Sequence, residues 1–371
     1  MAYNSRSDLY KQIEAIRKRP MIAYITSTRQ NASAQIASDV VPQLTKQLSC
    51  IPKETKEVDL LIVSDGGDPT VSWRIISLLR ERCDKVGALL PFAAFSAATL
   101  IALGADEIVM HPFANLGPVD PQLTYRRRIP AQPGQKETAE VVQFGSEDLR
   151  NYMEYVRNDV GISDQEQLAR AFELVCKEVG SIPIGVAKRG SQLALSMGEQ
   201  LLSLHMQDSS KAKAIAETLN KSFYHHGYPL GRKEVEKIGL PLSAPNEALE
   251  ELLWAVWEDI ELEMECNTIF DPLQVVLSDP AIAALLGPVA QVQIPANLPA
   301  AVAQAAYQQV LQQVNVVQVN PVDYSMFQAT VESPRCRSEF RTTIKISAVR
   351  LPDMNIQVGV VNTRQGWTFI P

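Results

Sequence analysis

The sequence predicts an α/β fold in which parallel strands alternate with helices. Two apolar runs, residues 58–63 and 85–90, read as buried strands, and each leads through a short turn into a pattern of helical periodicity. Strands that alternate with helices in this way pair in parallel through right-handed crossovers. Because such folds place their reactive groups where strands end and helices begin, the two turns are the first place to look for a site.

The first fifty residues should supply one more strand and two helices. An amphipathic pattern over residues 8–19 predicts a short helix, and residues 21–25 read as the first strand. Asn31 and Ser33 are typical of a helix cap, which predicts a helix over residues 34–48. Pro42 should kink or shorten that helix.

Helices dominate the middle of the chain. Pro69 suits the first position of a helix over residues 70–82, and residues 106–112 read as a short strand. Residues 126–142 are rich in Arg, Pro, Gln and Gly without a usable period, which predicts a mobile surface loop near the site. Further helices are expected over residues 147–161, 164–176, 191–206, 209–219 and 245–263.

The composition changes in the last hundred residues. Residues 280–322 contain no charged side chain, and residues 324–371 alternate like short strands. A helix over residues 300–314 could dock on the rest of the chain or on a second subunit. These shifts predict a large N-terminal domain over residues 1–265, a connecting segment rich in Ala, Val, Gln and Pro over 266–322, and a smaller, β-rich region over 323–371.

Composition excludes several classes of protein. The net charge of −7 gives no basic footprint for nucleic acid, and the one dense cluster, residues 126–128, lies in the expected loop. Five scattered cysteines without a CxxC pair argue against a disulfide framework or a zinc site and favour a reducing compartment. The N-terminus lacks the apolar core of a secretion signal, and the uncharged residues 87–105 read as buried core. We therefore expect a cytoplasmic protein without a transmembrane segment of its own.

The two turns carry residues suited to acyl transfer. Gly66 and Gly67 let the backbone turn sharply and leave amide N–H groups uncovered, while Ser96 opens an apolar helix whose first N–H groups have no helical partner. A glycine pair alone is commonly a tight turn, and a serine alone is commonly a helix cap. Together, the glycine pair and the serine are the residue types expected of a serine nucleophile beside an oxyanion hole.

Motifs around these turns are similar to those of a known family. Asp-Gly-Gly before a helix, the run Phe-Ser-Ala-Ala-Thr-Leu-Ile-Ala-Leu-Gly-Ala-Asp from residue 95, and Leu-Gly-Pro-Val-Asp-Pro-Gln from residue 116 resemble the serine dehydrogenase proteinase family. That family is a branch of the superfamily of the Clp protease proteolytic subunit, signal peptide peptidase A and the crotonases. Lys-Arg-Gly-Ser-Gln from residue 188 and the segment 226–240 extend the resemblance to residues 20–245.

The resemblance implies a Clp/crotonase-like spiral of ββα units with Ser96 as nucleophile. It also implies that the backbone N–H groups of Gly67 and Ala97 form the oxyanion hole. Two positions depart from the family pattern. Asp65 replaces a proline before the glycine pair, where its charge would oppose an oxyanion, and Ala98 replaces a glycine.

The general base is the open question, because a serine needs help to ionise. His226 is the first choice, since it lies in a segment that matches the family and precedes a Gly-Tyr-Pro turn, but it could equally be a surface or packing histidine. Asp120 lies close to the position at which the Clp subunit has its catalytic histidine. Asp120 could replace that histidine as a hydrogen-bonding group, or it could only form a turn before Pro121. His111 is expected to be structural. A lysine base, as in signal peptide peptidase A, would be Lys188 or Lys213.

The sequence thus predicts a serine hydrolase, most simply a peptidase that acts on peptides or proteins and assembles as a homo-oligomer. One alternative is a catalytically inactive scaffold or assembly subunit, and another is a crotonase-like acyl-CoA enzyme, although no acid/base carboxylate pair is evident. Neither a metal nor a cofactor is expected, because HExxH, GxGxxG and phosphate-binding loop motifs are absent from the sequence.

Overall fold

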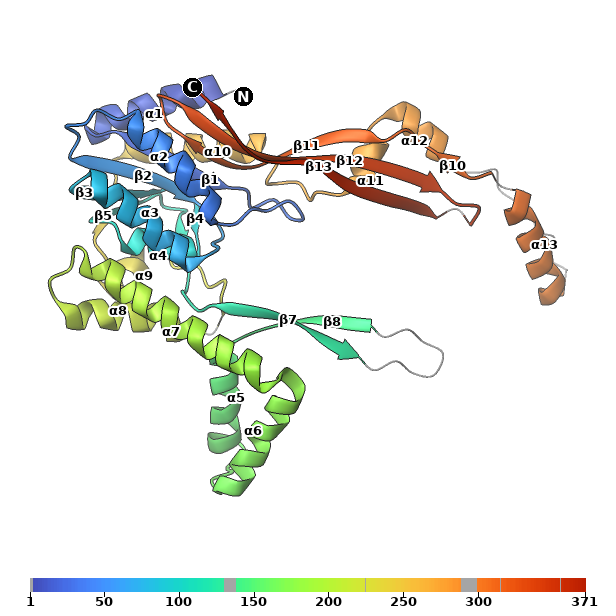
Figure 1. The fold of residues 1–371 in the computed structure, drawn as a ribbon, viewed down its shortest axis with the longest axis horizontal. Helices are drawn as coiled ribbons and strands as arrows, with labels where there is room; N and C mark the ends of the chain where they lie inside the picture. Colours follow the sequence, from blue (N-terminus) through green and yellow to red (C-terminus); the bar gives the residue numbers. More distant parts are fainter. Residues whose placement is uncertain (1–2, 130–137, 224, 288–298, 314, 354) are drawn as a thin grey trace.

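A computed structural model describes residues 3–129, 138–223, 225–287, 299–313, 315–353 and 355–371 (Figure 1). Its described residues form one large mixed sheet with the strand order β10-β12-β11-β1-β2-β3-β5-β9, and β13 pairs with β12. Helices cover both faces of the parallel half. The predicted α/β class is therefore confirmed.

The parallel half of the sheet contains the strands that the sequence predicts. Its members are β1 (Met21–Thr26), β2 (Glu57–Val63), β3 (Lys85–Leu90), β5 (Glu107–Met110) and β9 (Leu242–Ser243). Alternate residues of a strand face opposite sides, so that Ile22 and Tyr24 pack in one apolar cluster while Ala23 and Ile25 pack in another. Burial on both faces explains why these strands read as continuous apolar runs.

The helices divide between the two faces of this half. The face of Ile22 carries α2 (Val41–Ser49), α3 (Pro69–Arg82), α4 (Ala97–Leu103), α7 (Ser181–Ser203) and α8 (Ser209–Lys221). The opposite face carries α1 (Tyr3–Arg17) and α10 (Glu247–Glu263). A short helix, α9 (Arg232–Ile238), precedes β9.

A second, smaller ladder follows the ends of the parallel strands. After β3 the chain forms β4 (Ala93–Ala94) before α4, and after β5 it forms β6 (Asn115–Leu116), which pairs in parallel with β4. Ser64, directly after β2, bridges Ala94 before the chain enters α3. Each unit is thus a strand, a short second strand or bridge, and then a helix or loop, as expected for a spiral of ββα units.

The expected helix over residues 34–48 is wrong in its first half. Residues 31–37 are not helical; the chain instead forms a short 3-10 turn over Ser38–Val40, and α2 begins at Val41. Pro42 lies at the start of α2, where a missing N–H costs no hydrogen bond. The Asn31 side chain donates to the carbonyl of Phe270 instead of capping a helix.

The C-terminal strands are much longer than the sequence suggested. The chain forms β10 (Val317–Gln318), β11 (Val322–Glu332), β12 (Arg337–Arg350) and β13 (Ile356–Ile370), and Figure 1 shows them extending beyond the parallel strands. β11 pairs antiparallel with β1, with Ala23 opposite Glu332. Three helices precede them, namely α11 (Pro272–Leu277), α12 (Pro280–Leu286) and α13 (Ala300–Gln313). The division at residues 265 and 322 stays a prediction, as does docking of α13; residues 288–298 of the connecting segment lie outside the described residues.

The expected surface loop over residues 126–142 is replaced, in its described parts, by a hairpin. β7 (Gln122–Ile129) and β8 (Thr138–Gly145) pair antiparallel, while residues 130–137 lie outside the described residues. Two helices, α5 (Ser146–Asn158) and α6 (Gln165–Val179), follow the hairpin and lead into α7. The sequence of residues 126–142 does not predict β7 and β8, because a hairpin that projects into solvent buries little apolar surface and so lacks the apolar pattern of a strand. None of the helices within the described ranges has the length and apolarity to cross a membrane.

Candidate active site

The predicted site residues lie near one hydrogen-bonded ladder at the ends of the parallel strands. Ser64 pairs with Ala94, Ala94 with Leu116, and Leu116 with Leu230. The Leu116 and Leu230 backbones exchange two hydrogen bonds, at 3.0 and 2.8 Å. Gly67, Ser96, Asp120 and His226 each lie within four residues of a ladder position. The ladder therefore brings the four segments that carry these residues to one edge of the sheet, although the residues are up to 159 positions apart in sequence.

The glycine turn after β2 is held by side-chain and backbone hydrogen bonds. The Gly66 N–H donates to Oγ of Ser64 at 3.1 Å, and the same Oγ accepts from Oγ1 of Thr26 at 2.8 Å. The Gly66 carbonyl accepts from the Ile36 N–H at 2.8 Å. A Cβ atom on Gly67 would stand 2.3 Å from the Ile36 carbonyl oxygen, so only glycine fits there. The turn is fixed before any substrate arrives.

Ser96 has a backbone conformation that serines rarely adopt. Its φ and ψ angles are 53° and −113°, just before α4 begins at Ala97. Such a strained turn is common at reactive residues, where the surrounding structure enforces it. Gly66 approaches this residue closely, because an added Cβ at Gly66 would lie 2.8 Å from Cβ of Ser96 and 3.3 Å from the Ala97 nitrogen.

Two backbone donors at this junction are unused. Among the hydrogen bonds of the described residues, neither the Gly67 N–H nor the Ala97 N–H donates to a protein acceptor. Both belong to the glycine turn and helix start that meet at Ser96. Unused N–H groups at such a place are suited to bind a developing negative charge.

The start of α4 is anchored to the chain that leads to Asp120. Oγ1 of Thr99 lies 2.8 Å from the Ala94 carbonyl and 3.0 Å from the Gly117 carbonyl, and it accepts from the Gly117 N–H at 3.1 Å. Gly117 also packs on Phe95, since a Cβ there would lie 2.1 Å from the Phe95 ring. These contacts fix the position of Ser96 relative to the segment that ends at Asp120.

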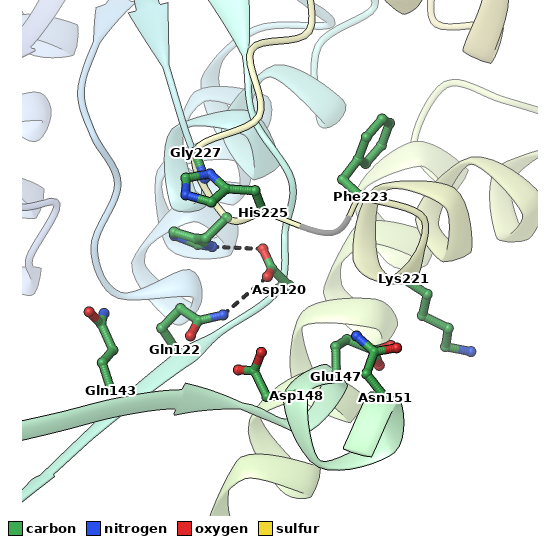
Figure 2. Close-up of a pocket in the computed structure, with 11 residues that line it drawn as sticks. Asp120, Gln122, Gln143, Glu147, Asp148, Asn151, Lys221, Phe223, His225 and Gly227 are labelled. Carbon is green, nitrogen blue, oxygen red and sulfur yellow. Dashed lines mark hydrogen bonds and ion pairs between the residues drawn. The ribbon is translucent and has the colours of Figure 1, made fainter. Parts of the chain in front are cut away.

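Asp120 and His226 form a close pair. Nδ1 of His226 lies 2.6 Å from Oδ1 of Asp120, and Gln122 donates to Oδ2 of Asp120 at 3.1 Å (Figure 2). The hydrogen bond to Asp120 is the main cause that raises the pKa of His226, against the opposing effect of burial. Asp120 is only 8% exposed, so its charge is little screened by water.

Neighbouring backbone holds this pair in place. The Val119 N–H donates to the Leu219 carbonyl at 2.8 Å, and the buried Asn220 side chain donates to the Val119 carbonyl at 2.8 Å. Oγ of Ser191 in turn donates to Oδ1 of Asn220 at 3.0 Å. Asp120 is thus positioned by α7 and α8 as well as by the ladder.

A polar pocket of about 420 Å³ lies beside the pair (Figure 2). Figure 2 shows Gln122 and Asp148 near Asp120, whereas the Lys221 side chain extends away from Asp120. Ser96 is not part of the lining. The lining consists of Asp120, Gln122, Gln143, Glu147, Asp148, Asn151, Lys221, Phe223, His225, His226 and Gly227.

The other candidate bases take no part in this arrangement. His111 stacks on Trp254 with ring centres 4.9 Å apart, and burial lowers its pKa, as befits the structural role expected of it. Lys188 and Lys213 are exposed. Within the described part of the chain, no hydrogen bond joins the Ser96 side chain to either lysine or to His226, whose side-chain hydrogen bond goes to Asp120. Asp65 has an exposed side chain, yet the protein around it desolvates the carboxyl enough to raise its pKa.

Sequence reasoning missed three residues that position the site. Ser64, Thr99 and Asn220 are all buried and each satisfies backbone groups of a reactive segment. A serine two positions before the glycine pair, and a threonine three positions after Ser96, were signals available for the first two. Asn220 gave none, because its partner Val119 is 101 positions away. No cluster of three or more His, Cys, Asp or Glu side chains among the described residues could hold a metal ion.

Comparison with known proteins gives one family match and two relatives. Residues 5–138 match a family described as ClpP-like SDH-type serine proteinase. One uncharacterised protein of Methanocaldococcus jannaschii is 27% identical over 190 residues, which cover 51% of this chain and 53% of that protein. Another from the same organism is 26% identical over 198 residues, which cover 53% and 57%. The match thus spans little more than half the length of these curated relatives.

Two solved structures also share similarity. A 1510-N membrane-bound stomatin-specific protease is 15% identical with a TM-score of 0.35, covering 63% of this chain and 84% of that chain. The ClpP protease catalytic domain from Plasmodium falciparum is 12% identical with a TM-score of 0.31, covering 62% and 89%. The family match confirms the resemblance seen in the motifs around Ser96, which lie inside residues 5–138, whereas His226 lies beyond them.

Proposed function

Because residues 5–138 match the ClpP-like SDH-type serine proteinases, we propose that this chain is a serine peptidase with Ser96 as nucleophile, His226 as general base and Asp120 as the carboxylate that orients it. The observation that carries the proposal is the 2.6 Å contact between Nδ1 of His226 and Oδ1 of Asp120, two residues whose segments join the same ladder as the segment of Ser96. Neither the scaffold nor the acyl-CoA alternative requires such a pair.

The tautomer follows from this contact. A carboxylate accepts hydrogen bonds, so Nδ1 of His226 carries the proton and Nε2 keeps its lone pair. In the proposed reaction, Oγ of Ser96 attacks the peptide carbonyl carbon while its proton passes to Nε2. The imidazolium that results is stabilised by Asp120. It then protonates the leaving amine, and an acyl-enzyme ester remains on Ser96.

The backbone donors serve the charged intermediate. As the carbonyl carbon becomes tetrahedral, its oxygen gains negative charge, and the N–H groups of Gly67 and Ala97 would donate to it. A water molecule, deprotonated by His226, then attacks the ester, and the proton returns to Ser96 as the acid product leaves. Asp65 opposes the oxyanion with its charge, but its side chain is exposed, so that water screens this opposition.

A serine-directed fluorophosphonate tests the nucleophile directly. We expect stoichiometric labelling of the wild type and none of Ser96→Ala, together with loss of peptide hydrolysis. Ser203→Ala is the matched control, because Ser203 is exposed and donates only to the Glu199 carbonyl. Equal labelling of Ser96→Ala and wild type would refute the assignment.

The same experiment separates the alternatives. A folded protein that is neither labelled nor hydrolytic, yet forms stable oligomers, would be the inactive scaffold. Binding of an acyl-CoA without labelling would indicate the crotonase-like enzyme. Assembly as a homo-oligomer and a cytoplasmic location stay predictions of the sequence, which oligomer size by light scattering and cell fractionation would test.

A further inference from the structure

Two cysteine sulfurs are in contact far from the site. Sγ of Cys336 lies 3.3 Å from Sγ of Cys50, although 286 positions separate the two residues. Cys50 directly follows α2 and is exposed, whereas Cys336 lies in the turn between β11 and β12 and is 3% exposed. Among the described residues, no hydrogen bond joins any other two cysteines.

The two thiols are held by well-anchored elements. The buried side chain of Gln47, one turn before Cys50, donates to the Val331 carbonyl at 3.0 Å and to the Cys336 carbonyl at 2.8 Å. Gln43, one turn earlier in α2, accepts from Oγ of Ser338 at 3.0 Å. The last turns of α2 are therefore fixed against both ends of the β11–β12 turn. The contact between the sulfurs does not depend on a free loop.

We propose that Cys50 and Cys336 are a redox-active thiol pair that forms a reversible intramolecular disulfide by exchange with a small disulfide such as oxidised glutathione. A disulfide holds its sulfurs about 2.05 Å apart, so the two atoms need to approach by a little over ~1 Å. This inference is independent of the proposed peptidase activity, because neither cysteine belongs to the ladder or lines the polar pocket beside His226.

The exposure of the two thiols sets the order of the steps. The thiolate of Cys50 attacks one sulfur of oxidised glutathione, the glutathione S–S bond breaks, and one glutathione leaves as thiol. Cys336 then loses its proton and attacks Sγ of Cys50, which releases the second glutathione. Overall, the protein dithiol is oxidised by two electrons and one glutathione disulfide is reduced to two thiols. Burial raises the pKa of Cys336, so the second step should be the slower one and should accelerate with pH.

The bond would join two distant parts of the chain. It would tie α2, which covers the parallel half of the sheet, to the hairpin whose first strand pairs with β1. Closing so long a loop restricts the unfolded chain strongly, which favours the folded state. The scatter of five cysteines gave no sign of this pair, because the partners meet only through the tertiary fold.

The test uses the full chain equilibrated with reduced and oxidised glutathione at several ratios. Free thiols are alkylated with iodoacetamide in guanidinium chloride, so that the buried Cys83 and Cys336 also react, and are counted by intact mass. Non-reduced tryptic peptides are then sequenced. We expect alkylated cysteines to fall from five to three as the ratio becomes oxidising, with one cross-linked peptide that contains Cys50 and Cys336, and a return to five after reduction. The melting temperature of the oxidised form should rise by several degrees.

Matched variants identify the pair. Cys336→Ser should leave Cys50 as a stable mixed disulfide with glutathione, whereas Cys83→Ser and Cys266→Ser should still form the cross-link. Retention of five alkylatable thiols in the folded wild type at every ratio would overturn the proposal, as would a cross-link that involves Cys83, Cys176 or Cys266. Since the wild-type measurement decides the outcome, it does not depend on the folding of a variant.

Discussion

Gly66 lies so close to Ser96 that a Cβ atom on the glycine would stand 2.8 Å from Cβ of the serine. The glycine also has a φ of +114°, which other residues rarely adopt. Any side chain at position 66 would therefore collide with Ser96, and the glycine turn or the start of α4 would have to move.

The first prediction is that Gly66→Ala abolishes most of the activity. The added methyl group should push the glycine turn away from Ser96 and misplace the Gly67 donor, and loss of one such donor lowers kcat by about 10²–10³-fold. The measurement is kcat for a fluorogenic peptide. Gly185→Ala is the control, because no atom lies within 4 Å of a Cβ built at Gly185. Equal kcat values for the two variants would contradict a fixed glycine turn at the site.

The second prediction concerns Asp120. Asp120→Asn keeps the shape of the side chain but removes its charge, so His226 loses both its orientation and the stabilisation of its protonated form. We expect kcat to fall by up to about 10⁴-fold, as for the equivalent change in a serine protease triad. Labelling of Ser96 by the fluorophosphonate should be lost in parallel. Asp148→Asn, which lines the same pocket but caps the Gly145 N–H, is the control and should lose far less. A fully active Asp120→Asn would make the pair a structural contact.

The third prediction is the pH dependence of the activity. The hydrogen bond from Asp120 raises the pKa of His226 above its ordinary value of 6.5, and only the neutral imidazole can accept the serine proton. We therefore expect kcat/KM to rise with pH through an apparent pKa above 6.5 in the free enzyme. Any residual activity of Asp120→Asn should rise at lower pH than that of the wild type. A profile without an ascending limb above pH 6 would exclude His226 as the base.

The pair has the opposite effect on stability. A raised folded pKa means that the folded state binds the proton more tightly, so the stabilisation is fully present below the unfolded pKa and is lost as the pH rises through the folded value. The activity thus develops over the pH range in which this contribution to folding fades.

The fourth prediction concerns a buried ion pair that joins the two ends of the chain. Nε of Arg6 lies 2.8 Å from Oε1 of Glu332, and both side chains are fully buried. Glu332→Ala would leave the Arg6 charge short of a partner and the Tyr10 hydroxyl without its acceptor. We expect it to lower the free energy of unfolding in urea by about 3–5 kcal/mol.

An exposed pair supplies the comparison for Glu332→Ala. Arg170 and Glu166 on α6 form an ion pair whose side chains are mostly in solvent, so Glu166→Ala should change the free energy of unfolding by less than about 1 kcal/mol. Similar effects of the two substitutions would show that Arg6 finds sufficient compensation from its other carboxylate neighbours, Asp259 and Glu263.

The sequence predicts the parallel half of the fold well, because its signals are local. The apolar runs at residues 58–63 and 85–90, and the proline at the first position of α3, are each decided within a few residues. The antiparallel half depends on pairings such as Ala23 with Glu332, which no local pattern encodes. The strand lengths of β11–β13 were underestimated for the same reason, since their regularity comes from pairing with one another.

The residues of the candidate site also differ in whether a local pattern predicts them. Ser96 and Gly67 could be proposed from their own segments, since a serine at a helix start and a glycine pair after a strand are visible in the sequence. The contact between Asp120 and His226 could not, because it is produced by the tertiary hydrogen bonds of Val119, Asn220 and Leu230. The sequence predicts Ile36 in a helix, because Ser33 is a residue type that commonly caps one. In the structure residues 33–37 are not helical, and the Ile36 backbone instead forms hydrogen bonds with Gly66 and Asp68 of the glycine turn.

The position of β1 between β2 and β11 has a consequence for synthesis on the ribosome. β2 emerges soon after β1, but the strand that covers the other edge of β1 is translated roughly three hundred residues later. Throughout that interval the nascent chain carries an apolar strand with one open edge, to which a neighbouring chain could add. Stalled or truncated products that stop before residue 322 should therefore be the species that chaperones must retain.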